Sequence, residues 1–139
     1  MNPKKVLVVG AGSGIGEALF TSLREDSNFQ VIGISRRGIS FTEKINPGFN
    51  YKCDLTSETE IYSFTNSYAN SFDAIDAIYF CQGDGLFGEI SSLTKDKIEK
   101  HFALNITSSF LILQKFYPLL KHSLKNPFVC FLSSTAGKV

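Results

Sequence analysis

Short, continuous apolar runs alternate along the chain with longer stretches in which apolar residues recur every three or four positions. Runs of this length are typical of strands that are buried on both faces of a parallel sheet. The segment 36–48 shows neither pattern, so it is predicted to be a surface loop. The predicted strands lie within residues 5–10, 29–35, 49–54, 73–81 and 127–134.

Three helices are predicted between these strands. The first begins near Gly14, at the end of a glycine-rich turn. The second begins after Ser57, and Glu60 stands at the capping-box spacing, at which each residue satisfies a backbone donor of the other. The third begins after Thr94, which suits an N-cap position, and continues to Lys121 as one long helix.

This order of elements predicts an α/β fold, a Rossmann-like doubly wound parallel sheet between two layers of helices (three-layer α/β/α). A length of 139 residues suits one domain with a core of its own and is too short for two. We therefore expect residues 1–139 to form a single domain.

The composition excludes several classes of protein. Apolar residues make up 43% of the chain, charged residues 19%, and the formal net charge is +1, without the basic excess of a nucleic-acid-binding protein. The longest apolar run is interrupted at Gln114 and Lys115, and no signal peptide precedes the glycines. Cys53, Cys81 and Cys130 are scattered, which favours reduced thiols over disulfides or a metal site. We expect a cytoplasmic protein without a nucleic-acid, membrane or metal partner.

Glycines dominate the turn between the first strand and the first helix. Residues 10–16 lie where the unpaired N–H groups and partial positive charge of a helix N-terminus favour an anion. Glycine lets a pyrophosphate approach the backbone, whereas a purely structural turn rarely needs four glycines. An ATP-type P-loop fits poorly, because no Gly-Lys-Ser/Thr follows. The predicted phosphate-binding residues are Gly10, Gly12, Ser13, Gly14, Ile15 and Gly16.

The spacing Gly-x-x-x-Gly-x-Gly, from Gly10 to Gly16, resembles the cofactor loop of the short-chain dehydrogenases/reductases. The resemblance implies hydride transfer between a nicotinamide cofactor and a carbonyl or alcohol substrate. In this family the end of the second strand chooses between NAD and NADP, and here it reads Ser35, Arg36, Arg37. Arginine suits the 2′-phosphate of NADP, so NADP(H) is predicted over NAD(H), with a solvated turn as the alternative role of the arginines.

Further matches follow in the family's order. Asp54 and Leu55 resemble the position that binds the adenine amino group, although Asp54 also suits the opening of a turn. After the fourth strand the family has Asn-Asn-Ala-Gly, whereas residues 80–83 are Phe-Cys-Gln-Gly, so the asparagine contacts are lost. The resemblance still places the backbone of Cys81 and Gly83 beside the cofactor ribose.

Two predicted catalytic residues also come from the resemblance. Asn105 matches the helix asparagine that helps to hold the water of the proton relay, and Ser134 matches the hydroxyl that hydrogen-bonds the substrate carbonyl. The family's Tyr-x-x-x-Lys pair, which supplies the proton, follows this serine, but the chain ends at Val139. We therefore expect the family's C-terminal strands and helices to be missing and the 139 residues to be inactive alone.

Tyr117 and Lys121 have the spacing of that pair but precede the serine. Tyr117 lies on the same predicted helix as Asn105, about 18 Å further along it. Because that helix runs antiparallel to the strands, this end points away from the cofactor edge, and the pair is not predicted to be catalytic.

The resemblance favours the cofactor-binding part of an NADP(H)-dependent oxidoreductase. The alternative is a non-catalytic NADP(H)-binding or oligomerisation module, which the altered residues 80–83 favour. Another Rossmann-like enzyme, such as a methyltransferase, would need different residues at the strand ends. The helix over 94–121 is apolar on more than one face, so we expect a homo-oligomer, a dimer, that forms through it.

Overall fold

The computed structural model describes residues 2–134, and its centre is one sheet of five parallel strands. The strand order β3-β2-β1-β4-β5 confirms the predicted doubly wound sheet, with β1 in the middle. The last three strands are shorter than their apolar runs, and the connector 36–48 contains no helix, as predicted. The strands are β1 (Lys4–Val9), β2 (Phe29–Ser35), β3 (Asn50–Lys52), β4 (Ala77–Phe80) and β5 (Phe128–Phe131).

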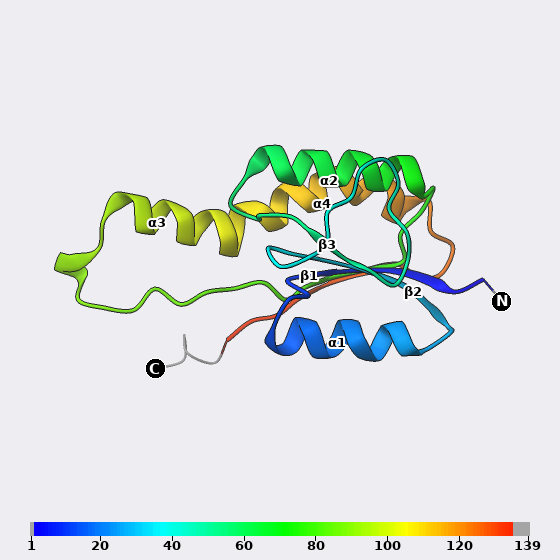
Figure 1. Ribbon diagram of the computed structural model, residues 1–139, viewed down its shortest axis with the longest axis horizontal. Helices are drawn as coiled ribbons and strands as arrows, with labels where there is room; N and C mark the ends of the chain where they lie inside the picture. The colour runs from blue at the N-terminus through cyan, green and yellow to red at the C-terminus, as the bar shows by residue number, and fades with distance from the viewer. Residues whose placement is uncertain (1, 135–139) are drawn as a thin grey trace.

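Helices cover both faces of the sheet and confirm the three-layer architecture. In Figure 1, α1 (Gly14–Glu25) lies on one face, while α2 (Glu58–Ser71) and α4 (Ser108–Lys121) lie on the other. After a short 3-10 turn (Ile90–Ser92), α3 (Lys95–Phe102) extends beyond the sheet, at the end where the strands finish. None of the helices in residues 2–134 is long and apolar enough to cross a bilayer.

The core is divided by the sheet, because successive side chains of a strand point to opposite faces. Val6 and Val8 of β1 pack with Phe20 of α1 in the smaller cluster. Leu7 and Val9 belong to the larger cluster, which contains the buried residues of α2 and α4. Burial on both faces explains why the β1 sequence is continuously apolar rather than alternating.

The long helix predicted from Thr94 to Lys121 is continuous but not α-helical throughout. Residues Ala103–Thr107 form a π-helical segment between α3 and α4. Within it, the Asn105 side chain donates from Nδ2 to the His101 carbonyl at 2.9 Å, the acceptor that an α-helix would pair with the Asn105 N–H. Hydrophobic periodicity does not indicate this change of helix type.

Two of the predicted helix caps are present, with one correction. Ser57 Oγ accepts from the Glu60 N–H at 3.3 Å, and Thr94 Oγ1 accepts from the Lys97 N–H at 3.3 Å. The prediction that the Glu60 side chain accepts from the Ser57 N–H is wrong. Glu60 Oε2 accepts from the Asp54 N–H at 2.8 Å instead. The reason is that the Ser57 N–H already donates to the Asp54 carbonyl at 3.0 Å in a tight turn.

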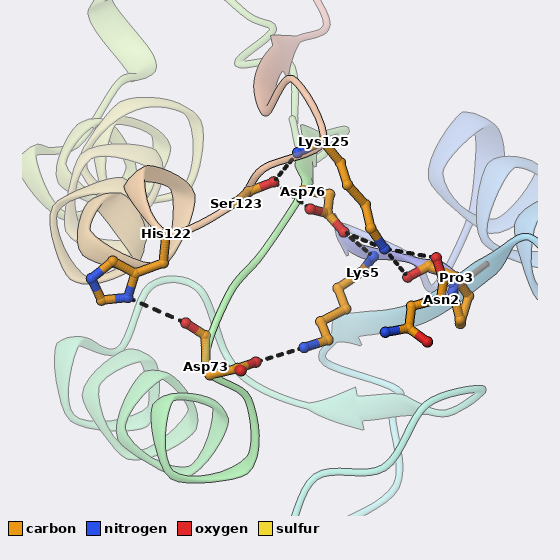
Figure 2. A network of polar contacts seen from close by, with 8 residues as sticks. All are labelled: Asn2, Pro3, Lys5, Asp73, Asp76, His122, Ser123 and Lys125. Carbon is orange, nitrogen blue, oxygen red and sulfur yellow. Dashed lines mark hydrogen bonds and ion pairs between the residues drawn. The ribbon is translucent and has the colours of Figure 1, made fainter.

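A polar network joins the amino ends of β1 and β4 to the connection between α4 and β5 (Figure 2). Asp76, which is 4% exposed, accepts from the Lys5 N–H at 2.7 Å and from the Ser123 hydroxyl. Lys125 Nζ donates to the Pro3 carbonyl at 2.9 Å and lies 4.0 Å from the Asp76 carboxylate. The network lies at the amino ends of the strands, opposite the glycine-rich turn, so it stabilises the framework.

Candidate functional site

The carboxyl ends of the strands surround a hollow at the glycine-rich turn, which we call the loop hollow. Open α/β sheets bind their ligands at this edge. The lining comes from the β1–α1 turn, from the ends of β2 and β3, and from the segment after β4. The predicted cofactor-binding residues that line it are Gly10, Gly12, Ser13, Ser35, Arg36, Arg37, Leu55, Cys81 and Gly83.

Close approaches of the protein's own atoms shape the glycine turn. Gly10 has φ +85°, and a Cβ there would lie 2.7 Å from the backbone nitrogen of Gln82. A Cβ at Gly16 would lie 2.1 Å from the Gly10 carbonyl oxygen, so α1 packs directly on the end of β1. A Cβ at Gly12 would lie 2.8 Å from Ser35 Oγ, a packing reason that the sequence does not reveal. The turn is therefore closed on its inner side.

The start of α1 is open on its outer side and lacks a side-chain cap. Ser13 holds the N-cap position, but its side chain makes no capping hydrogen bond, whereas Ser57 and Thr94 cap their helices. Gly14 has φ +57°, and a side chain there would meet no atom within 4 Å. Ile15 is 67% exposed. A bare, uncapped helix N-terminus is the arrangement that favours a bound phosphate.

A larger cleft, which we call the outer cleft, continues from the loop hollow toward α3. Ser13, Arg36, Gly83 and Leu104 line both. The outer cleft has a volume of about 650 Å³, and its other walls come from the turn after β3, the loop after β4, and α3. Its further lining residues include Asp54, Thr56, Asp84, Lys97, Lys100 and His101.

Asp54 lies in the outer cleft and opens the turn before α2. Its Oδ1 accepts from the Thr56 N–H at 2.9 Å and from Thr56 Oγ1 at 2.7 Å. Burial raises the pKa of Asp54, but these hydrogen bonds and the charges of Arg36 and Lys100 outweigh burial and lower it overall. The carboxylate is therefore ionised at neutral pH and is able to accept a hydrogen bond. The turn role is observed, and the adenine contact stays a prediction.

The segment after β4 has its own contacts in place of the family's asparagines. Phe80 is buried and stacks on Phe131, with ring centroids 4.8 Å apart. Gln82 Nε2 donates to Ser109 Oγ at 2.6 Å and to Ser108 Oγ at 3.3 Å. The Gln82 Oε1 atom is buried without a hydrogen-bond partner among residues 2–134. Gln82 also lines the loop hollow, but this oxygen is itself buried and is not at the surface of the hollow.

Two thiols line the loop hollow. Burial, with the negative charges of Glu60 and Asp54, raises the pKa of Cys53 to about 12. Burial, with Cys130 nearby, also raises the pKa of Cys81. Both thiols are therefore protonated at neutral pH, so neither is an activated nucleophile.

Asn105 ties the loop after β4 to the π-helical segment. Its Oδ1 accepts from the Asp84 N–H at 3.0 Å, and its Nδ2 donates to the Asp84 carbonyl at 3.2 Å. Its Nδ2 also lies 3.0 Å from Nδ1 of His101, which is half-buried. The side chain thus fixes the loop that lines the outer cleft, and the water-holding role stays a prediction.

Ser134 follows β5 at the carboxyl edge of the sheet and is exposed. Neither it nor Asn105 is among the residues that line the loop hollow or the outer cleft. Tyr117 and Lys121 line a separate apolar hollow with Phe128, at the beginning of β5. They therefore lie at the opposite edge of the sheet from the glycine turn, as predicted.

Several residues of the site are not predicted from the sequence. Asn50 of β3 donates from Nδ2 to Ser35 Oγ at 2.9 Å and to the Ala11 carbonyl at 3.3 Å, which fastens the glycine turn to β2. Strand pairing alone creates this contact, so no sequence signal precedes it. The wall formed by α3 does have a signal, because its residues recur at helical spacing. These residues are Lys97, Lys100 and His101 of α3, followed by Leu104 of the adjoining π-helical segment.

The parallel sheet and the bare N-terminus of α1 beside a hollow at the strand ends define a protein of the Rossmann-like class. Comparison with protein families gives the particular group: the sequence model described as short chain dehydrogenase matches residues 4–139. The chain belongs to the short-chain dehydrogenase family.

Individual relatives are similar at low identity. Sepiapterin reductase of Chlorobaculum tepidum is 24% identical over 145 residues, which cover 95% of this chain and 59% of that protein. A short chain dehydrogenase family protein from Francisella tularensis superimposes with a TM-score of 0.79 at 26% identity, covering 95% of this chain and 51% of the other. A short chain dehydrogenase from Leptospira borgpetersenii with bound NAD+ gives a TM-score of 0.81 at 24% identity, covering 99% and 54%. The chain thus spans between 51% and 59% of the length of these relatives.

Proposed function

We propose that this chain supplies the cofactor-binding part of an NADP(H)-dependent oxidoreductase, which transfers hydride between the nicotinamide and a small carbonyl or alcohol substrate. The observation that carries the proposal is the loop hollow, where the uncapped start of α1 lies beside Arg36 and Arg37 at the end of β2. Membership of the short-chain dehydrogenase family supports a nicotinamide cofactor and argues against a methyltransferase. The bound NAD+ of the Leptospira relative supports the same class of cofactor.

The groups of the loop hollow fit such a cofactor. The turn has no side chain at Gly14 to block a phosphate, and the α1 N–H groups are suited to hold it. Asp54 and Leu55 are suited to the adenosine end. When bound, the nicotinamide supplies or accepts the hydride, while the groups of this chain hold and orient it.

Preference for NADP(H) follows from the charge at the end of β2. Arg36 and Arg37 are exposed at the rim of the loop hollow, and the residue before them is Ser35 rather than an acid. A guanidinium pairs with phosphate through two parallel hydrogen bonds. A charge-assisted hydrogen bond contributes about 1.5–3 kcal/mol, enough for a preference of about tenfold or more.

For the chemical step, the proposal assigns Ser134 to orient the substrate oxygen and Asn105 to hold the water of the proton relay. The position of Ser134, just after β5 at the cofactor edge of the sheet, supports its assignment. Asn105 has a supporting contact as well, since its side chain already fixes the backbone of Asp84 in the adjoining loop.

The proposal also covers the assembly and location of the protein. We propose one domain that forms a homo-oligomer through the helical run that contains α4, where Phe110 is 69% and Tyr117 59% exposed. Apolar patches of this kind are typical of protein interfaces. Three free thiols support a reducing compartment such as the cytoplasm.

Calorimetric titration of the complete chain with NADPH and NADH tests the proposed cofactor. We expect NADPH to bind about tenfold more tightly, because only it carries the 2′-phosphate. Arg36→Asp is expected to reverse this preference, since the carboxylate repels the phosphate and accepts from the ribose hydroxyls of NADH. Lys44→Asp makes the same change of charge in the connector, outside the residues that line the hollow, and is expected to leave the ratio unchanged.

If the ratio of the NADPH and NADH affinities is unchanged in Arg36→Asp, including by an equal loss of affinity for both, Arg36 does not select the cofactor. Absence of heat with either dinucleotide would contradict the proposed function as a whole. The altered residues 80–83 favour the non-catalytic alternative. The oxidoreductase requires a Tyr-x-x-x-Lys pair encoded beyond Val139, so tight NADPH binding by a protein whose reading frame encodes no such pair would support the non-catalytic module.

A further inference from the structure

One face of the helical run that begins with α3 presents cations to the outer cleft. Lys97, Lys100 and His101 line it together with Leu104, at positions i, i+3, i+4 and i+7, which share one side of a helix. Lys95 belongs to the same helix but is not among the lining residues of the cleft. The chain therefore contains a cationic wall and, two residues before Lys97, a lysine outside this wall for comparison.

Arg36 lies on the wall formed by the sheet. It is at the carboxyl end of β2 and lines both the loop hollow and the outer cleft. The charges of Arg36 and Lys100 both act on the carboxylate of Asp54 and favour its ionised form. The two cations, which come from different elements, thus lie within electrostatic reach of one group in the cleft.

Cations outnumber carboxylates along the cleft. The Lys100 ammonium lies 3.1 Å from Asp96 Oδ2, but these side chains are 68% and 72% exposed, so the pair is weak and screened by salt. Lys100 is therefore able to turn to a more highly charged anion. The charged lining residues are Arg36, Lys97, Lys100, Asp54 and Asp84, with His101 beside them.

We propose that Lys100, assisted by Lys97, binds the 2′-phosphate of NADP(H) together with Arg36, so that α3 forms the second wall of the cofactor-selecting site. This inference rests on the proposed function, because it requires a nicotinamide dinucleotide in the loop hollow. Ser13 and Arg36 line both cavities, so a dinucleotide with its phosphate at the start of α1 would reach the outer cleft with its adenosine end past these two residues. A phosphate there carries a charge of about −1.5 to −2 and is attracted by cations on both walls.

The test compares 2′,5′-ADP with 5′-AMP, which differ only by the 2′-phosphate, in calorimetric titrations of the complete chain. Lys100→Gln is expected to raise the Kd for 2′,5′-ADP about threefold to tenfold, and the double variant Lys97→Gln/Lys100→Gln further. The Kd for 5′-AMP is expected to stay the same, because the shared 5′-phosphate binds at the glycine turn. Lys95→Gln, which removes an equal charge outside the cleft, is expected to leave the Kd of both ligands unchanged.

Two results overturn the inference: an unchanged Kd for 2′,5′-ADP in the double variant, or an equal loss of affinity for 2′,5′-ADP and 5′-AMP. If Arg36→Asp abolishes the preference for 2′,5′-ADP while the lysine variants keep it, the NADP preference stands and the role of α3 is wrong. If the unmodified chain binds the two ligands equally, the NADP preference itself is wrong, and the inference is overturned with it.

Discussion

The four glycines of the first turn serve different purposes. Gly10, Gly12 and Gly16 lack side chains because backbone or side-chain atoms of the protein occupy the space that a Cβ needs. Only Gly14 faces open space, at the outer side of the turn where α1 begins. A glycine pattern in the sequence therefore combines a packing requirement with a binding requirement, and the structure separates them residue by residue.

Two single variants are expected to separate stability from binding: Gly14→Ala mainly lowers the affinity for NADPH, and Gly16→Ala mainly lowers the free energy of unfolding. Gly14→Ala places a Cβ at φ +57°, a conformation that destabilises the fold by about 1 kcal/mol, and puts a methyl group on the open side. NADPH affinity is expected to fall about tenfold. Gly16→Ala puts a Cβ 2.1 Å from the Gly10 carbonyl oxygen and is expected to lower the free energy of unfolding by about 3 kcal/mol.

Urea unfolding measures the first quantity and calorimetry the second. Full stability of Gly16→Ala would contradict the close packing of α1 on β1. Unchanged NADPH affinity of Gly14→Ala would contradict a phosphate at the start of α1.

At the scale of elements, the helical run from α3 to α4 has two different surroundings. α4 packs on the sheet beside α2, whereas α3 extends beyond the sheet and lines the outer cleft (Figure 1). The π-helical segment Ala103–Thr107 lies at the junction of α3 and α4. Segments of this kind often occur at functional sites. Asn105 joins the loop after β4 to this point, so its side chain links the helical run that lines the cleft to the loop.

At the amino ends of β1 and β4, the polar network centres on the buried carboxylate of Asp76. Asp76→Ala removes the acceptor of the Lys5 N–H and of the Ser123 hydroxyl, so two partly buried donors lose their partner (Figure 2). The expected loss is about 2 kcal/mol in the free energy of unfolding, measured by urea denaturation.

Asp73→Ala is the matched control for this change. It removes an ion pair with Lys5 Nζ at 2.7 Å, but the Asp73 side chain is 91% exposed, so little loss of stability is expected. If both variants lose the same free energy of unfolding, burial of Asp76 does not determine how much its network stabilises the protein.

At the scale of the whole molecule, apolar side chains remain exposed along α4 and β5. Phe110 and Tyr117 stand seven residues apart on α4 and therefore share a face, and Phe128 and Phe131 of β5 are 44% and 56% exposed. Exposed aromatic residues in such an arrangement are typical of surfaces that another chain covers.

Phe110→Glu tests whether a second copy of the chain covers this surface. We expect the unmodified chain to sediment as a dimer and Phe110→Glu to shift toward the monomer at micromolar concentration, because a buried, unpaired carboxylate opposes association. Leu124→Glu changes a side chain that is 98% exposed outside the helix and is expected to leave the dimer intact. A monomeric unmodified chain, or an unchanged dimer in Phe110→Glu, would contradict the proposed oligomer.

The sequence by itself determined the fold class, the element order and the edge of the sheet at which the site lies. These features depend on local patterns: apolar runs for buried strands, helical spacing for α1, α2 and α4, and glycines at one strand–helix turn. Nine predicted residues line the loop hollow, because each lies at or after a strand end that chain order already specifies. The capping box was only half predictable, since the Ser57 N–H has a nearer acceptor in the Asp54 carbonyl.

Only the tertiary structure decided which side chains from distant elements meet. Asn50 reaches the glycine turn because β3 pairs with β2, and Asn105 of the π-helical segment meets Asp84 in the loop after β4. Lys100 shares a cleft with Arg36 for the same reason: the two are far apart in sequence and come together only when the helical run crosses the end of the sheet. Local patterns encode what each segment becomes, whereas packing of the whole chain sets the distances between segments.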